Sequence, residues 1–229
     1  MANCINIQRS LDWCMGTPEL PGIKRRVYYI AKNQIVKWPA FLRDDNGRVS
    51  SSTLSGSFTL VADAKWHYIV ILADKSQLTS EAQGEVPSQT QLNKATLVHP
   101  GVGPEASAAS AYLNNSDNVF VVEDMKGNFR IVGSERWMTK TTVAQDNGQG
   151  ATGTTSTTIS VEATDEIPSP FYVGTLDTEE GVIHCGDGTT TGGNTDNNGS
   201  GSNTGNTGSG GNTGNTGGDD DDTSGSLGE

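Results

Sequence analysis

The fold class is decided by residues 118–174, which read NVFVVEDMKGNFRIVGSERWMTKTTVAQDNGQGATGTTSTTISVEATDEIPSPFYVG. Two apolar runs, Val119–Glu123 and Phe129–Val132, flank a Lys-Gly-Asn turn at 126–128. This pattern predicts a β-hairpin, because β-branched and aromatic residues favour strands while Asn and Gly favour turns. The β-branched run Thr157–Ala163 predicts a further strand. The stretch therefore indicates a β-sheet domain.

A long arc rich in Gly, Thr, Ser, Asn and Gln joins the second of these strands to the third, and it has no charge between Asp146 and Glu162. A polar loop of this length is uncommon inside a β-domain and is usually functional or disordered. It carries no nucleophile, base or metal-ligand cluster, which favours recognition of another protein surface over chemistry. We expect Gln145–Thr158 to be a hairpin arm that is mobile in the free subunit and ordered between subunits. The candidate subunit-interface residues are Gln145, Asp146, Asn147, Gly148, Gly150, Gly153, Thr154 and Thr155.

The other elements follow from hydrophobic patterning and from turn residues. One helix is predicted, because Pro104 suits a first helical position and Ala106–Leu113 is rich in alanine. We expect a hairpin in which Thr53–Asp63 pairs with a strand over Trp66–Asp74 that is buried on both faces. The remaining expectations are a strand over Ile23–Lys32, a short helical turn over Asn33–Trp38, a turn at 45–48, a strand near Asn93–His99, a last short strand over Phe171–Val173 and a transitional segment over Thr175–Cys185.

These elements predict a mainly β domain, a β-sandwich or barrel with one flanking α-helix. The domain is expected to span residues 1–185. Residues 189–226 contain no apolar side chain, so they cannot bury enough surface to offset their chain entropy. Residues 186–229 are therefore predicted to be a disordered Gly/Asn/Thr/Asp-rich tail that is dispensable for folding.

The chain has a net charge of −12. Seven of its 27 acidic residues lie after position 186 and all 15 basic residues lie before it, so the body carries 20 acids against 15 bases. This balance opposes specific binding of nucleic acid, which requires clustered positive charge. The one basic cluster, Lys24-Arg25-Arg26, is interpreted as a solvated start of a strand rather than a phosphate site. No apolar run has the length of a membrane span or the pattern of a signal peptide, so synthesis in a reducing cytoplasm with free thiols is expected.

No constellation of residues indicates catalysis, so the protein is expected not to be an enzyme and to have no cofactor or metal site. The three cysteines lack metal-ligand spacing. His67 is interpreted as a packed or surface residue of a strand, and His99 as a loop residue. The neighbours His184 and Cys185 could form a dyad, but they lie among acids at the edge of the tail, where a reactive thiolate is not favoured.

The order of features resembles the major tail (tail tube) proteins of tailed phages and of prophages of gut bacteria. The matching residues are Gly22–Lys24 with Tyr28–Ile30, the hairpin FVVEDMKGNFRIVGSE at 120–135, the Gly/Thr loop, and TISVEATDEIPSPFYVG at 158–174. The resemblance covers much of residues 20–175 and lies in the ordered pattern more than in an invariant signature. The tail after it falls outside the resemblance.

The resemblance implies a β-sandwich or barrel whose copies associate into rings, of six copies in this reading, that stack into a hollow tube. DNA would pass through the lumen without specific binding. The implied partners are other copies of the chain and other phage tail proteins, with no membrane. The implied location is the virion tail, after synthesis in the bacterial host cytoplasm. Two alternatives stay open: another virion component, such as a head decoration, neck or fibre protein, and a non-viral interaction domain.

Overall fold

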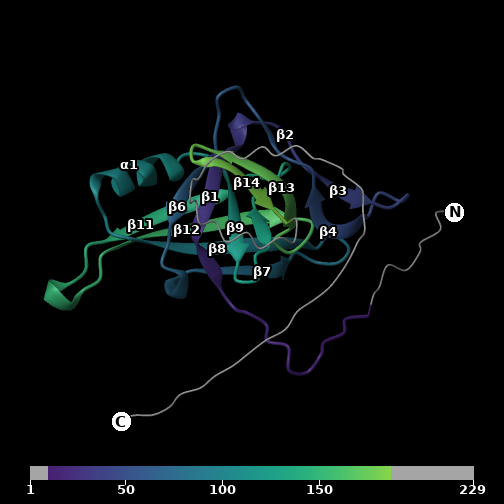
Figure 1. Ribbon diagram of the computed structural model, residues 1–229, viewed down its shortest axis with the longest axis horizontal. Helices are drawn as coiled ribbons and strands as arrows, with labels where there is room; N and C mark the ends of the chain where they lie inside the picture. The colour runs from purple at the N-terminus through teal and green to yellow at the C-terminus, as the bar shows by residue number, and fades with distance from the viewer. Residues whose placement is uncertain (1–9, 187–229) are drawn as a thin grey trace, which may run out of the picture. The chain divides into compact units, whose positions relative to one another are not determined.

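The computed structural model of the protein describes residues 10–186, which form a mainly β fold with one α-helix (Figure 1). The predictions for residues 1–9 and 187–229, the disordered tail among them, lie outside the described residues. The elements in chain order are β1 (Ile23–Ala31), η1 (Lys32–Gln34), β2 (Ile35–Lys37), β3 (Ala40–Arg43), β4 (Val49–Ser55), β5 (Thr59–Leu60), β6 (His67–Val70), η2 (Ala73–Lys75), β7 (Gln77–Gln83), β8 (Thr90–Pro100), α1 (Pro104–Leu113), β9 (Asn118–Asp124), β10 (Phe129–Val132), β11 (Lys140–Asp146), η3 (Gly150–Thr152), β12 (Ser156–Asp165), β13 (Phe171–Thr178) and β14 (Gly181–Cys185).

The strands form two main sheets. The larger sheet has eight strands in the order β3-β4-β13-β10-β9-β1-β6, with β14 paired to β13. The smaller has four strands in the order β11-β12-β8-β7, and β2 pairs separately with β5. Neither sheet is closed. Of the two predicted architectures, the structure therefore has the sandwich-like one and not the barrel.

Strand β9 lies at the centre of the larger sheet and is buried on both faces. Its side chains alternate, so that Phe120 and Val122 enter one hydrophobic core while Val119 and Val121 enter another. All four are fully buried. The continuous apolar run in the sequence is thus explained, because a strand covered on both faces needs apolar residues at every position.

The two cores lie on opposite faces of the larger sheet. The first fills the space between the two sheets, where Val27 of β1 and Phe120 of β9 share a cluster with Leu97 of β8 and Val161 of β12. The second covers the other face and is built around aromatic rings. In it, Phe58 lies 5.2 Å from both Trp66 and Tyr172, measured between ring centroids.

Helix α1 confirms its prediction, with Gly103 before it, Pro104 at its first position and Asn114 at its end. Leu113 anchors the helix in the core between the sheets. The Oδ1 atom of Asn114 accepts a hydrogen bond of 2.7 Å from the backbone N–H of Val143 in β11. The helix therefore protects part of the β11 edge, whose outward N–H groups would otherwise offer a template for pairing.

The predicted hairpin over Thr53–Asp63 and Trp66–Asp74 is wrong. Gly56, at a φ of +94°, ends β4, and the short β5 that follows pairs with β2. The apolar run after Trp66 forms only the short strand β6, which pairs with β1 at the edge of the larger sheet. Three of the four β6 residues are exposed, because an edge strand that extends past the core is covered on one face at most.

The structure also corrects two shorter segments and adds strand β7. The helical turn predicted over Asn33–Trp38 is a 3-10 turn that stops at Gln34 and gives way to β2. The segment Thr175–Cys185, expected to be transitional, completes β13 and forms β14. Strand β7 was not predicted, because its sequence QLTSEAQ is mostly polar. Polar residues are tolerated there since β7 is an edge strand with solvent beside it.

Candidate functional site

The hairpin of β11 and β12 extends past the rest of the smaller sheet. These strands pair as far as Asp146 with Ser156, and the neighbouring strand β8 ends where Pro100 pairs with Ser156. Residues 147–155, called the arm tip from here on, lie beyond both ladders, and Figure 1 shows them projecting away from the sheets. The arc predicted as one polar loop is therefore partly strand, because β11 occupies 140–146.

The arm tip has a turn geometry that depends on its own sequence. The Asp146 carboxylate accepts a 2.8 Å hydrogen bond from the backbone N–H of Gly148, which has a φ of +75° that favours glycine. Gly153 is required for a different reason: a Cβ there would lie 2.3 Å from the backbone nitrogen of Gln149. The two sides of the tip thus approach each other as closely as glycine allows.

Three side-chain hydrogen bonds fix the base of the arm, two of them to the body and one between its own strands. Gln145 accepts one of 3.1 Å from Ser107 of α1 and donates one of 3.2 Å to Thr157. The Thr157 hydroxyl in turn donates to the carbonyl of Gly101 at 2.8 Å. The carbonyl of Thr155, where the tip returns to β12, also accepts a 3.2 Å hydrogen bond from the N–H of Gly101. The arm therefore leaves the body from a defined anchor, and the turn hydrogen bonds of the tip lie within the hairpin.

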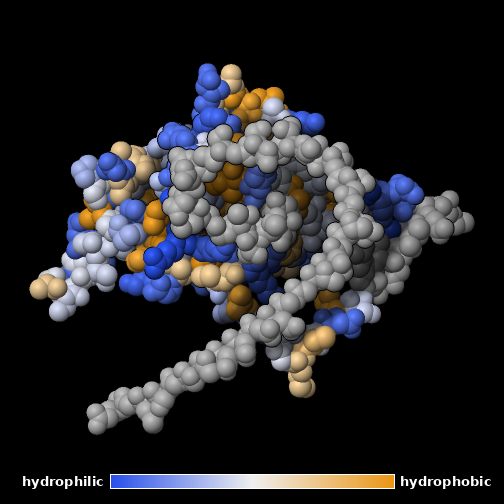
Figure 2. Space-filling model, in the orientation of Figure 1, coloured by the Kyte–Doolittle hydropathy of each residue, from blue (hydrophilic) through white to orange (hydrophobic). Residues whose placement is uncertain are grey.

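The eight predicted interface residues all lie at the end of this arm. Gln145 and Asp146 end β11, Gly150 begins η3, and the others lie in the irregular part of the tip. All are exposed except Gly148, which is half-buried. Figure 2 colours the tip mostly pale, between hydrophilic and hydrophobic. Apart from Asp146 these residues are uncharged, so the surface offers amide, hydroxyl and main-chain groups for hydrogen bonding to another chain.

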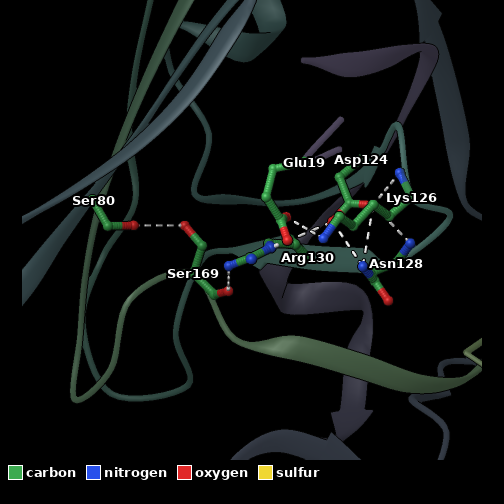
Figure 3. A network of polar contacts seen from close by, with 7 residues as sticks. All are labelled: Glu19, Ser80, Asp124, Lys126, Asn128, Arg130 and Ser169. Carbon is green, nitrogen blue, oxygen red and sulfur yellow. Dashed lines mark hydrogen bonds and ion pairs between the residues drawn. The ribbon is translucent and has the colours of Figure 1, made fainter. Parts of the chain in front are cut away.

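A second polar cluster ties the two sheets together (Figure 3). Asp124 accepts hydrogen bonds from the backbone N–H groups of Lys126 and Asn128, which closes the β9–β10 turn. Arg130 donates to the carbonyl of Ser169 at 3.3 Å, and the Ser169 and Ser80 hydroxyls lie 3.0 Å apart. These polar atoms satisfy one another, so we interpret the cluster as structural.

Asp165, at the end of β12, is the one acid with a strongly raised pKa in the described part of the chain. It is 5% exposed, and burial raises its pKa to about 6. The backbone N–H of Glu166 donates a 2.7 Å hydrogen bond to its carboxylate and opposes this shift. Glu166 itself pairs with Arg43 and Arg136. These ion pairs leave Asp165 without a salt bridge of its own among residues 10–186.

The histidines and cysteines do not converge. His99 lies in strand β8 and not in a loop as predicted, and its Nδ1 atom is 2.7 Å from the carbonyl oxygen of Val70. His184 is exposed while its neighbour Cys185 is buried in the aromatic core, so the two side chains face opposite sides of β14. Within residues 10–186, no group of three or more His, Cys, Asp or Glu side chains is arranged to hold a metal ion.

An aromatic groove between α1 and the β1–β6 edge was not found from the sequence. It has a volume of about 230 Å³, and the rings of Tyr29 and His67 lie 5.7 Å apart on its wall. The groove is lined by Tyr29, Ala31, Gln34, His67, Ala109 and Tyr112. The sequence signal that could have indicated it is the pair Tyr28-Tyr29. Neighbouring residues of a strand point to opposite faces, so two adjacent tyrosines place an aromatic ring on each face of the sheet.

No helix in the described part of the chain is long and apolar enough to cross a membrane. Comparison of the chain with protein-family models, with curated proteins and with solved structures found no match.

Proposed function

We propose that the protein is a structural subunit of a virion, of the tail-tube type, whose copies assemble into rings that stack around a channel for DNA. Its partners are other copies of the chain, with other tail proteins at the ends of the tube. It performs no catalysis and needs no cofactor. The proposal joins the resemblance in the sequence to the physical features of the described body.

The observation that carries the proposal is the projecting arm. The tip of this hairpin is exposed, and its Gly148 and Gly153 stand where a side chain would be strained or would clash. The tip therefore has a defined shape although it does not pack in the body. Such a shape is typical of a segment that fits a second surface. Ordering a free loop costs about 1–2 kcal/mol per residue in backbone entropy, so a partly fixed tip lowers the cost of association.

The open sheets supply further surfaces for assembly. Strands β3 and β6 end the larger sheet and β7 ends the smaller one, so each has one edge with no paired strand in the described fold. An unpaired edge is a template for a strand from another chain. In such an assembly, contacts between strand edges would join the copies within a ring, and contacts made by the arms would join one ring to the next.

The net negative charge of the body is compatible with a channel through which DNA passes. With 20 acids against 15 bases before residue 187, its net field repels DNA and would allow a duplex to move without binding to the wall. This argument concerns the whole surface and assigns no residue to the lumen.

Negative-stain electron microscopy of the purified full-length protein tests the proposal. We expect hollow tubes or stacked rings that become more abundant as the protein concentration rises. Discrete particles at every concentration, or solid fibres without a channel, would contradict a tail-tube subunit and favour another virion component or a non-viral interaction domain.

A further inference from the structure

The segment before β1 exposes three large apolar side chains. Residues 10–22 have no regular secondary structure, and Leu11, Trp13 and Met15 are 98%, 62% and 91% exposed. In this structure the chain turns after Cys14, whose carbonyl accepts a 3.3 Å hydrogen bond from the N–H of Thr17. The three residues occupy every second position, so their side chains would point to one face if residues 10–15 became extended. Exposed apolar side chains gathered on one face are typical of an interaction site.

The segment is held away from its own open edge strand. The backbone N–H of Met125 donates a 3.3 Å hydrogen bond to the carbonyl of Gly22, and Glu19 forms an ion pair with Lys126. Both contacts lie on the β9–β10 turn. In the sheet order, β9 and β6 flank β1 on opposite sides. The segment of one copy therefore starts on the side of β1 opposite to its own β6.

Strand β6 presents a matching edge. Tyr68 and Val70 are each 41% exposed and lie on one face, since they occupy alternate positions opposite Tyr28 and Arg26 of β1. His67 lies on the other face, beside the aromatic groove. The edge thus carries partly covered apolar groups beside strand backbone that has no paired strand on this side. The Val70 carbonyl of this edge already lies 2.7 Å from the Nδ1 atom of His99, so an added strand would pair at Tyr68 and replace this contact at Val70.

Asp12 of the segment and Arg25 at the start of β1 carry opposite charges. Residues 10–22 contain two acids, Asp12 and Glu19, and no base. Next to β6, the start of β1 carries three basic residues, of which Lys24 pairs with Glu123 and Arg26 with Glu180. Arg25 is exposed and makes no ion pair within residues 10–186. An incoming strand that contains Asp12 would bring a carboxylate toward Arg25.

We propose that residues 10–15 of one copy add as an extra strand to β6 of a second copy. Leu11, Trp13 and Met15 then extend the apolar face that Tyr68 and Val70 leave partly open. Asp12 and Cys14 lie on the opposite face, the one that carries His67. The inference rests on the self-assembly proposed above and names one of the contacts that build the ring.

Cysteine cross-linking of the full-length protein tests this placement, because Cys14 is exposed and Cys185 is buried. In a Cys4→Ser background, His67→Cys places a thiol on the face that Cys14 reaches, and Tyr68→Cys places one on the other face. A disulfide needs Cβ atoms within about 4.5 Å, so only one of the two faces permits it. Under mild oxidation, His67→Cys should give a disulfide-linked dimer on a non-reducing gel. Mass spectrometry should find a peptide in which Cys14 is joined to the thiol introduced at position 67, and Tyr68→Cys should give several-fold less dimer.

Thr79→Cys, on the exposed edge strand β7, controls for random collision and should match the low yield of Tyr68→Cys. Equal yields at all three positions would overturn the inference. A disulfide between Cys14 and the introduced thiol within one monomer would overturn it as well. If the protein forms tubes but His67→Cys gives no dimer, the inference fails while the tail-tube proposal stands. If neither the parent nor any variant associates at all, both fail.

Discussion

The arm tip and the N-terminal segment both extend from the sandwich, yet they differ in what they expose to water. The tip at 147–155 is polar, closed by its own hydrogen bonds and shaped by glycines. Residues 10–22 are apolar at alternate positions and have no regular structure. The tip can therefore remain solvated in a free subunit, whereas the segment gains free energy when it is covered. Defined shape and apolar surface are supplied by separate parts of the chain.

Among side-chain substitutions, the largest effect on assembly should come from removing the apolar side chains of the N-terminal segment. We expect the triple variant Leu11→Ser, Trp13→Ser, Met15→Ser to raise the concentration needed for assembly by at least about tenfold. The reason is that each apolar side chain contributes about 1.5–3 kcal/mol when buried, and about 1.4 kcal/mol corresponds to tenfold. Light scattering over a dilution series measures this concentration.

The thermal midpoint of the triple variant should equal that of the parent, because these side chains do not pack in either core. Val36→Ser with Val86→Ser is a matched control, since these residues are 66% and 80% exposed but lie elsewhere on the surface. If the control impairs assembly as much as the triple variant does, apolar exposure in general is responsible and the contrast with the tip is lost.

A smaller effect is expected from Gly153→Ala in the arm tip. The added methyl would lie 2.3 Å from the Gln149 nitrogen, so the tip must change shape although its chemistry is unchanged. Assembly should weaken several-fold while the thermal midpoint stays within error. Gly103→Ala, where an added Cβ meets no atom within 4 Å, should leave both quantities unchanged. Normal assembly of Gly153→Ala would show that the shape of the tip is not recognised.

The smallest effect on assembly, with a clear effect on stability, is expected from Asp165→Asn. The folded-state pKa of Asp165 is raised from 3.8 to about 6, so the folded protein holds this proton more tightly than the unfolded chain. Its contribution to stability is therefore lost as the pH rises from about 4 to about 6. Asparagine has no carboxyl group to ionise, so the variant does not lose stability over this pH range. Its side-chain oxygen can still accept the hydrogen bond from the backbone N–H of Glu166.

At pH 7.5 the Asp165→Asn variant should be more stable than the parent by at most about 3 kcal/mol, and near pH 3.5 the two should be equal. Urea unfolding at the two pH values measures the difference. A gain for Asp165→Asn that is the same at both pH values would point to packing rather than titration.

The elements predicted best from the sequence are those whose local signals agree with their surroundings. The β9–β10 hairpin combines apolar runs with a turn in which Asp124 caps the backbone of Lys126 and Asn128. Helix α1 has its proline at the start and alanines within. The position of the interface candidates at a hairpin end was also predictable, because glycine and threonine gather there.

The elements predicted least well are edge strands. The sequence of β6 predicts a buried strand, whereas the sequences of β7 and β14 predict no strand at all. Of β13, only the start at Phe171–Val173 was predicted. In each case the exposure of a strand depends on which neighbour it pairs with, and pairing between distant segments is not encoded locally. The aromatic groove was missed for the same reason, since α1 and β1 approach only in the folded chain.

The most direct test is to replace residues 147–155 with Asn-Gly. A two-residue turn of this type joins Asp146 to Ser156 without shifting the β11–β12 register. The matched control replaces residues 84–89, the connection between Gln83 and Thr90 on the same sheet, with the same two residues. Electron microscopy and thermal unfolding of parent and both variants should show three equally stable proteins, of which only the arm variant forms no tubes. Tubes of normal length from the arm variant would contradict the role assigned to the arm.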